Sequence, residues 1–231
     1  SQQIFPSDSV LVKTLSLPAA SGGGDSPRRV ETQLLHFDGK FWRGYSYAWN
    51  DEQTDAELID AAGGEVSLSP SRTWHFPSRM ECARCHNQWA EYALAFNPRQ
   101  LNRVHDYGAA RDNQLRTLAH VGALELPPPK DAPTTPAPAH SAPSAEWYAD
   151  HYPRLSGLAD DTRSLDQRVR SYLHVNCAHC HRQGGGGTAY IELQEELPIE
   201  ATKALDVRPT QGTFDISDAR ILAPGDPYRS T

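Results

Sequence analysis

Two copies of one short pattern, C-x-x-C-H, constrain this chain more than any other feature. The first copy runs from Cys82 to His86 within MECARCHN, and the second runs from Cys177 to His181 within RSYLHVNCAHCHRQGGGG. The chain has 4 cysteines, and the two copies use all of them. The fold must therefore place two thiols and one imidazole together at two separate points of the sequence.

Several kinds of chemistry compete for such a pattern. A zinc ribbon places its two cysteine pairs about 15–20 residues apart, whereas most of a domain separates the pairs here. Long loops can still bring distant pairs together, so zinc remains an alternative. A thioredoxin-like dithiol needs a strand before the motif and a βαβ setting, but a helical pattern precedes the second motif. Disulfides within each pair leave both histidines unexplained.

Covalent haem c accounts for every residue of the pattern. The two thiols add across the vinyl groups of the haem, and the adjacent histidine binds the iron from the proximal side. The sequence therefore predicts two covalently attached haem c groups and no catalytic side chain. The predicted haem-binding residues are Cys82, Cys85, His86, Cys177, Cys180 and His181, and the predicted iron ligands are His86 and His181. The intervening Ala83, Arg84, Ala178 and His179 are expected to face away from the haem.

The sixth ligands of the two irons are not evident from the motifs. The single methionine, Met80, lies two residues before Cys82 and is expected to pack on the proximal side rather than to bind iron. His174 is one helical turn before Cys177, so it is expected to flank its own haem. The candidates for the first haem are His36, His75, His105 and His120. Each of these four, taken alone, is more typical of a structural or surface histidine.

The first part of the chain has the composition of β-strands. Three segments rich in Val, Leu, Thr and aromatic residues are expected to be strands: 9–15, 30–37 and 40–49. The Asp38-Gly39 pair predicts a tight hairpin between the second and third of them. Residues 50–63 are expected to form a short helix that ends at Gly63, and residues 65–76 are expected to be extended.

From Met80 onward the pattern becomes helical. Helices are expected over 82–96, 112–122 and 165–181, with a short strand at 188–193. Prolines crowd the segment that begins at residue 127, which predicts an extended linker or a loop pinned along the surface. The predicted fold class is α+β, with three parts. They are a β-rich and helical module carrying the first haem (1–126), a Pro-rich linker (127–145), and a small, mostly α, cytochrome c-like module carrying the second haem and cut short at its C-terminus (146–231).

Composition excludes some partners. The formal net charge is −7, and acidic and basic residues are interspersed rather than clustered. A nucleic-acid partner favours clustered Lys and Arg, so none is expected. No apolar run approaches the roughly 20 residues of a membrane span, so no transmembrane span is expected either. The sequence starts with Ser and shows no signal peptide, which is typical of a mature or excised segment.

Longer phrases of the chain resemble a known family. They are FPSDSVLVKT, RRVETQLL, GYSYAWNDEQTDAEL, TWHFPSR, CARCHN, RDNQLRTLAHVGAL, RSYLHVNCAHCH, DVRPTQGTF and ARILAPGDPYRS. They are similar to the dihaem c-type cytochrome modules of exported bacterial proteins, some of which follow a sugar dehydrogenase propeller that uses pyrroloquinoline quinone (PQQ). The resemblance covers nearly the whole chain apart from the proline-rich segment.

This resemblance implies electron transfer with redox protein partners, a PQQ-dependent dehydrogenase among them. It also implies a periplasmic or otherwise exported location in a bacterium, which agrees with haem c being attached outside the bacterial cytoplasm. In such modules a methionine-containing loop follows a stretch like ARILAPGDPYRS, but this sequence reaches Thr231 without one. The second haem is therefore expected to bind a histidine, to stay open, or to take a ligand from outside these residues. No propeller is present, so dehydrogenase activity is not implied.

Residues 5–86 also have a weaker similarity to the cytochrome c′-beta group, which includes lysine-crosslinked haem enzymes. Lys13 is the formal counterpart of the crosslinked lysine, although an ordinary strand lysine with its ammonium group in solvent is the preferred interpretation. The preferred function is a dihaem electron relay. The alternatives are a haem enzyme, peroxidase-like or handling nitrogen oxides or hydroxylamine, and a gas-binding module. Each alternative needs one open iron, and the enzyme also needs polar groups such as His75 or Arg79.

Overall fold

The structure is a computed structural model that describes residues 5–18, 27–126 and 144–231. The chain divides into two compact units. The first unit contains Ser1–Ala93 and Gln183–Gly187, and the second contains Leu94–Arg182 and Thr188–Thr231. Within the described ranges, no helix has both the length and the apolar character needed to cross a membrane.

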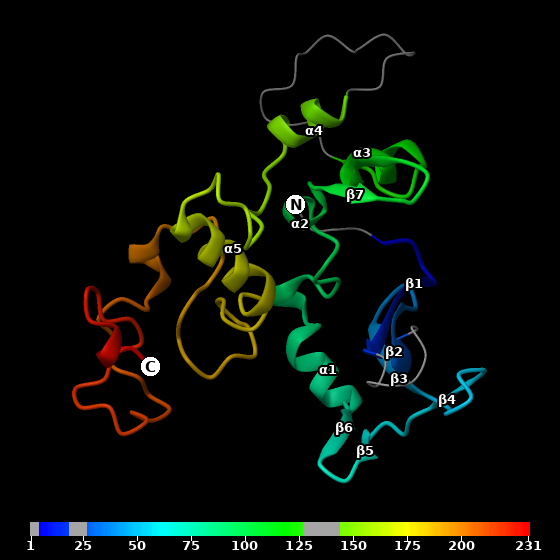
Figure 1. Cartoon of the computed structure of the whole chain (residues 1–231), viewed down its shortest axis with the longest axis horizontal. Coiled ribbons are helices and arrows are strands. Elements are labelled where there is room, and N and C mark those ends of the chain that lie inside the picture. The colour runs from blue at the N-terminus through cyan, green and yellow to red at the C-terminus, as the bar shows by residue number, and fades with distance from the viewer. Residues whose placement is uncertain (1–4, 19–26, 127–143) are drawn as a thin grey trace. The chain divides into compact units, whose positions relative to one another are not determined.

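A four-stranded antiparallel meander forms most of the first unit (Figure 1). Its strands, in spatial order, are β1 (Ser9–Leu17), β2 (Arg28–Phe37), β3 (Trp42–Trp49) and β4 (Ala56–Leu58). The predicted hairpin joins β2 to β3. The Asp38 carboxylate accepts hydrogen bonds from the backbone N–H groups of Lys40 and Phe41, and Gly39 has φ +89°. The three strands expected from the sequence are therefore confirmed; β1 and β2 are two residues longer than expected, and β3 begins at Trp42 rather than at residue 40.

A second hairpin leads into the first C-x-x-C-H motif (Figure 1). It consists of β5 (Gly64–Ser69) and β6 (Arg72–Phe76), and helix α1 (Arg79–Cys85) follows, then the short 3-10 helix η1 (Gln88–Ala90). The extended chain expected at 65–76 is confirmed. The expected helix over 82–96 is wrong beyond Cys85, because the Asn87 side chain caps a new turn and Glu91 and Tyr92 adopt left-handed backbone conformations.

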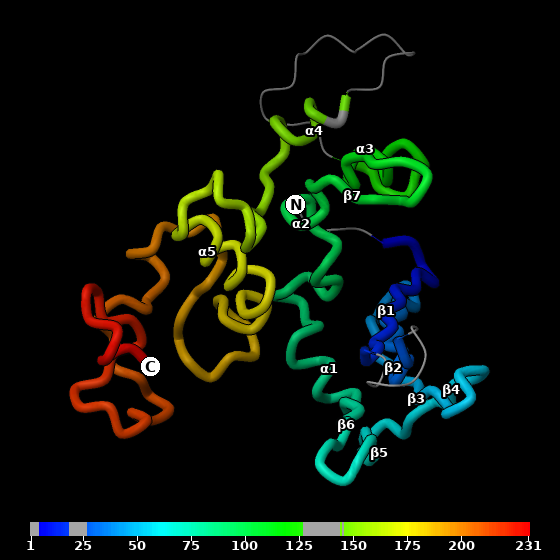
Figure 2. Tube along the Cα trace, in the orientation of Figure 1, coloured from blue at the N-terminus to red at the C-terminus, as the bar shows by residue number. Residues whose placement is uncertain are grey.

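The second unit is mostly helix and loop. Its elements are α2 (Pro98–Leu101), β7 (Val104–Asp106), β8 (Arg111–Asn113), α3 (Gln114–His120), α4 (Ala145–His151), α5 (Leu165–Asn176), and the 3-10 helices η2 (Ile199–Thr202) and η3 (Pro227–Arg229). The helix expected at 112–122 is confirmed as α3. Asn113 caps it, and Gly122 follows it at φ +72°. The trace from α5 to the C-terminus runs through wide loops (Figure 2).

A buried polar contact ties α2, α3 and α4 together. The amide of Asn102 donates to the carbonyl oxygens of Tyr148 and Tyr152, and its own oxygen accepts from the Asn113 amide at 2.8 Å. Asn102 and Asn113 are each 2% exposed. These bonds join residues 94–126 to the chain after residue 144. The main segment of the first unit therefore ends at Ala93, whereas the expected boundary between the modules was at residue 126. The expected linker, 127–145, lies almost wholly outside the described residues.

Two predicted elements are wrong. The helix expected over 50–63 is a turn followed by β4, because the Asn50 side chain accepts from the backbone N–H groups of Thr54 and Asp55. The strand expected over 188–193 is irregular. There the N–H groups of Glu192 and Leu193 donate to the carbonyl oxygens of Thr202 and His181 instead of to a neighbouring strand. The fold class is nevertheless α+β, with a small antiparallel sheet and few helices.

Candidate functional site

The first C-x-x-C-H motif occupies the end of a well-capped helix. Ser78 begins α1 with a capping box, in which its side chain accepts from the Glu81 N–H and the Glu81 carboxylate accepts from the Ser78 N–H. Such a box satisfies N–H groups that a helix start leaves open. Cys82 and Cys85 are three residues apart on this short helix, so both thiols lie on one face.

Cys82 packs against the sheet at a position where only glycine fits closely. A Cβ atom at Gly44, on β3, would lie 3.0 Å from the Cβ and 3.1 Å from the Sγ of Cys82. Burial first, and then the negative charges of Glu31 and Glu81, raise the pKa of the Cys82 thiol above its ordinary value. Cys82 is therefore held against the sheet mainly as a neutral thiol at neutral pH.

An open cavity of about 190 Å³ adjoins the first motif. It lies between α1 and the strands β2 and β3, and its lining mixes apolar side chains with two guanidinium groups. The lining residues are Leu35, Trp42, Arg43, Gly44, Arg79, Cys82, Ala83 and His86. One cysteine and the histidine of the motif thus face the same space. Ala83, expected to face away from the site, contributes to the lining as well.

The imidazole of His86 is held by a backbone contact. Its Nδ1 atom lies 2.6 Å from the carbonyl oxygen of Tyr92. Because a carbonyl oxygen can only accept, Nδ1 carries a proton, and in the neutral imidazole Nε2 keeps its lone pair. A hydrogen bond from the second nitrogen to a carbonyl is the usual support of a metal-binding histidine. This contact leaves Nε2, rather than Nδ1, as the ring nitrogen that could act as a ligand.

The second motif follows helix α5 and forms a turn of its own. Ser164 begins α5 with a capping box to Gln167. The helix ends at Asn176, so the expectation of a helix as far as residue 181 is wrong. Cys177 then accepts from the N–H groups of Cys180 and His181 at 3.0 and 2.8 Å. This turn brings the two cysteines and the histidine of the motif close together without a regular helix.

The environment of His181 differs from that of His86. The His181 carbonyl accepts from the Leu193 N–H at 2.9 Å. Its Nδ1 atom is buried, and within the described part of the chain no group forms a hydrogen bond with it. Such an orphaned nitrogen is unusual in a folded protein. The residue therefore has an unused ring nitrogen inside the second motif.

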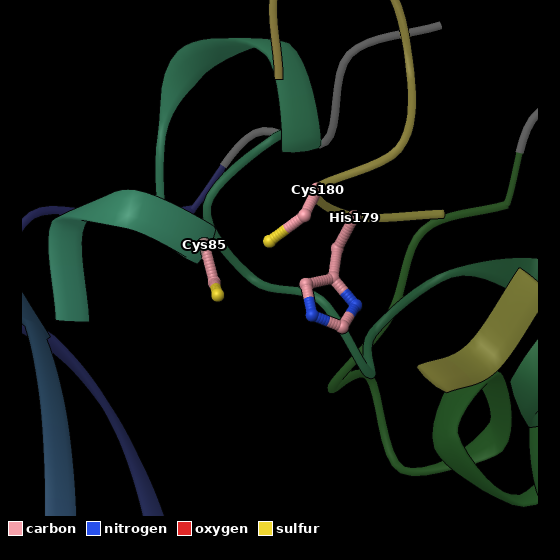
Figure 3. Close-up of side chains that lie close together, drawn as sticks. All are labelled: Cys85, His179 and Cys180. Carbon is pink, nitrogen blue, oxygen red and sulfur yellow. The ribbon is translucent and has the colours of Figure 1, made fainter. Parts of the chain in front are cut away.

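Figure 3 shows Cys85 at the end of α1, and His179 and Cys180 side by side in the turn after α5. His179 was expected at the surface and is half-buried, whereas its neighbour Ala178 is 3% exposed. Each motif contains two cysteines, Cys82 with Cys85 and Cys177 with Cys180. Each motif therefore offers two thiols for covalent attachment.

Two candidates for the sixth ligand of the first haem, His36 and His75, lie in the first unit. His36 alternates with Leu35 on β2, so it points to the face of the sheet opposite Gly44. There its Nε2 lies 3.5 Å from Asp8. His75 is on β6, exposed, with its Nε2 3.3 Å from the Glu81 carboxylate. Neither histidine lines the cavity beside His86.

The other two candidates belong to the second unit, whereas the first motif belongs to the first. His105 is on β7 and contacts the Tyr107 ring edge-on at 4.6 Å, and His120 is exposed at the end of α3. His174, expected to flank the second haem, accepts from the Glu195 N–H through Nδ1 at 3.1 Å. Met80 is 78% exposed and Lys13 is exposed.

Several residues of the first site were not predicted from the sequence. They come from the sheet or from the loop after the motif: Glu31, Leu35, Trp42, Arg43, Gly44 and Tyr92. One signal was available in RRVETQLL, because strand alternation places Glu31, Gln33 and Leu35 on one face. A carboxylate on an otherwise buried strand face indicates a special environment.

Comparisons of the chain with protein-family models, with curated proteins and with solved structures gave no match.

Proposed function

We propose that this chain is a dihaem c-type cytochrome that relays electrons between redox protein partners. Its haem c groups would be attached at two sets of residues: Cys82, Cys85 and His86, and Cys177, Cys180 and His181. The observation that carries the proposal is the hydrogen bond from His86 Nδ1 to the Tyr92 carbonyl. In the neutral imidazole it leaves Nε2 with its lone pair, and Cys82 of the same motif lines the cavity that His86 also lines.

Three further features support the fit of a haem group to these residues. Each motif provides two cysteine sulfurs, which can form thioether bonds with a haem. The cavity beside Cys82 and His86 offers apolar contacts from Leu35 and Trp42. The buried Nδ1 atom of His181 lacks a hydrogen-bond partner in the described residues, so that imidazole is not committed to a structural role. Both motifs therefore contain the donor set that a haem c iron takes.

The roles of the chain's own residues follow from this arrangement. Haem c supplies an iron that accepts and releases one electron at a time. Cys82 and Cys85 would fix the first group to α1, while Tyr92 holds the ring orientation of His86. Cys177 and Cys180 would fix the second group to the turn after α5. None of these side chains needs to move a proton for electron transfer. A periplasmic or otherwise exported location belongs to the same proposal.

One observation favours a second candidate function at the first motif. Arg43 and Arg79 line the open cavity that His86 also faces, so cationic groups lie close to the proposed iron position. Guanidinium groups stabilise developing negative charge on a small bound molecule. A haem enzyme or a gas-binding module with one open iron would use this feature, whereas an electron relay would not require it.

Optical and electron paramagnetic resonance spectra of the ferric chain separate the two candidates. An electron relay predicts two low-spin signals and no change on addition of carbon monoxide to the reduced chain. A high-spin signal with carbon monoxide binding would contradict the relay for that iron and support the second candidate. An Arg79→Gln variant would then alter carbon monoxide binding if the cavity holds the ligand. An Arg84→Gln variant, on the same helix but outside the cavity lining, is the matched control.

A further inference from the structure

A carboxylate is buried inside the first unit. Glu31, on β2, is 1% exposed. Its Oε1 accepts from the Ser46 hydroxyl at 2.7 Å and from the Gln33 amide at 3.0 Å, and its Oε2 accepts from the Trp74 indole N–H at 3.0 Å. Three neutral donors on three different strands therefore converge on one side chain.

No positive charge balances this carboxylate. Within the described ranges, no Lys, Arg or His side chain forms an ion pair with Glu31. Burying an unpaired charge is costly, and hydrogen bonds from neutral groups recover only part of that cost. A neutral residue of similar size would fill the position at lower cost, so the carboxylate indicates a positive partner that the described residues do not supply.

The position of Glu31 indicates where that partner belongs. In the register of β2 with β3, Gln33 is opposite Ser46 and Leu35 is opposite Gly44, so Glu31 shares their face of the sheet. Cys82 packs on that face at Gly44. The carboxylate is close enough that its charge, after burial, is the next cause of the raised pKa of the Cys82 thiol. The field of Glu31 therefore acts on the first attachment site.

We infer that Glu31 is the buried negative charge that lowers the reduction potential of the haem attached at Cys82 and Cys85. The inference rests on the proposed function. The oxidised iron centre has one positive charge more than the reduced centre, so a fixed negative charge nearby favours oxidation. Burial strengthens the effect because little water screens the charge. The same attraction gives the carboxylate a positive partner, which the part of the chain that the structure describes does not provide.

A first experiment tests the field of Glu31 without haem. The full chain, made without haem attachment, is treated with iodoacetamide at pH 8, and peptide mass spectrometry follows alkylation of Cys82 against Cys177 as an internal standard. Thiolate is the reactive form. Glu31→Gln should therefore speed the reaction at Cys82 by about threefold or more, because a repelling charge is gone. An unchanged Cys82 rate would overturn the inference.

Glutamine is compatible with the site. Its carbonyl oxygen can accept from Trp74, while its NH₂ group faces the Ser46 hydroxyl and the Gln33 amide, both of which can switch from donor to acceptor. Trp74→Phe is the structural control, because it removes one hydrogen bond and keeps the charge. Glu57→Gln, at an exposed site on β4, removes an equal charge that solvent screens.

A second experiment measures the potentials of the chain with haem attached. In a spectroelectrochemical titration, Glu31→Gln should raise one of two one-electron steps. The reduction equilibrium should shift at least tenfold, which is about 59 mV, whereas Trp74→Phe and Glu57→Gln should not raise it. Unchanged potentials in Glu31→Gln, or an equal rise in Trp74→Phe, would overturn the inference. A chain that attaches no haem would overturn the proposed function and the inference with it. Alkylation, which needs no haem, separates the two failures, because an unchanged Cys82 rate overturns the inference alone.

Discussion

The Nδ1 atom of His86 donates a hydrogen bond to the carbonyl oxygen of Tyr92, 2.6 Å away. This contact fixes the imidazole as the Nδ1–H tautomer, because the carbonyl can only accept. Long-range proton–nitrogen NMR of the chain without haem, at a pH where the imidazole is neutral, should therefore show protonated Nδ1 and unprotonated Nε2 at His86. His75, which is exposed and close to two carboxylates, is a useful comparison. A spectrum with the proton on Nε2 of His86 would contradict the proposed metal-binding role.

Gly44 should be a sensitive position in the first unit. In Gly44→Ala the new methyl group would meet Cys82 at 3.0–3.1 Å, and overpacking of this kind costs about 1–3 kcal/mol of folding free energy. Gly64→Ala is the matched control, because its methyl group would have no neighbour closer than 3.9 Å. It should be neutral or stabilising by up to about 1 kcal/mol. Urea denaturation measures both variants, and equal effects would contradict the close packing of Cys82 on β3.

Arg170 should stabilise the second unit through backbone carbonyls. The residue is 7% exposed, and its Nη2 donates to the carbonyl oxygens of Gln194 and Leu197. Arg170→Met keeps the apolar stem but removes these donors, so unfolding should become easier by about 1.5–3 kcal/mol. The exposed Arg154→Met, in the same unit, should stay within about 0.5 kcal/mol of the unmodified chain. Similar losses in both variants would show that Arg170 has no special role.

His174 should make the second unit less stable in mild acid. Burial, only partly offset by Glu196, lowers the pKa of its imidazole below the ordinary 6.5. The unfolded chain then binds a proton that the folded chain does not, so stability is complete above about pH 6.5 and falls as the pH drops toward the folded pKa. Denaturation in urea at pH 7.5 and pH 5.0, on the chain without haem, measures this loss.

His174→Asn is the informative variant for that experiment. Asparagine places an acceptor near the former Nδ1, where the Glu195 N–H donates, and it does not titrate. The variant should lose less stability between the two pH values than the unmodified chain. His120→Asn, at an exposed position, should keep the original dependence. If His174→Asn and the unmodified chain behave alike, another group causes the loss.

The sequence predicted the sheet well where local signals and tertiary contacts agree. Strands β1, β2 and β3 have the right composition, and Asp38-Gly39 forms the expected turn. The helix expected over 50–63 failed because Asn50 closes a turn with its side chain, and pairing of Tyr47 with Leu58 then extends the chain. Local propensity cannot anticipate such a tertiary contact.

The motif residues of the candidate site could be predicted from the sequence, but the residues that surround them could not. The three residues of each motif lie within five positions of one another, so spacing alone was enough to predict them. Glu31 depends on donors from Ser46 and Trp74, which are 15 and 43 residues away. The cavity likewise joins β2, β3 and α1, and no single stretch of sequence contains it. Long-range contacts of this kind become visible only in the folded chain.

The central claim is that each C-x-x-C-H motif attaches one haem. The direct measurement is the number of haem c groups per chain, from the pyridine haemochrome spectrum and the denatured intact mass, after expression with the bacterial haem-ligation machinery. Two groups are expected in the unmodified chain. One is expected in the double variant Cys82→Ala/Cys85→Ala and one in Cys177→Ala/Cys180→Ala. An unmodified chain with one haem or none, while a control cytochrome c made in the same cells is fully loaded, would contradict attachment at both motifs.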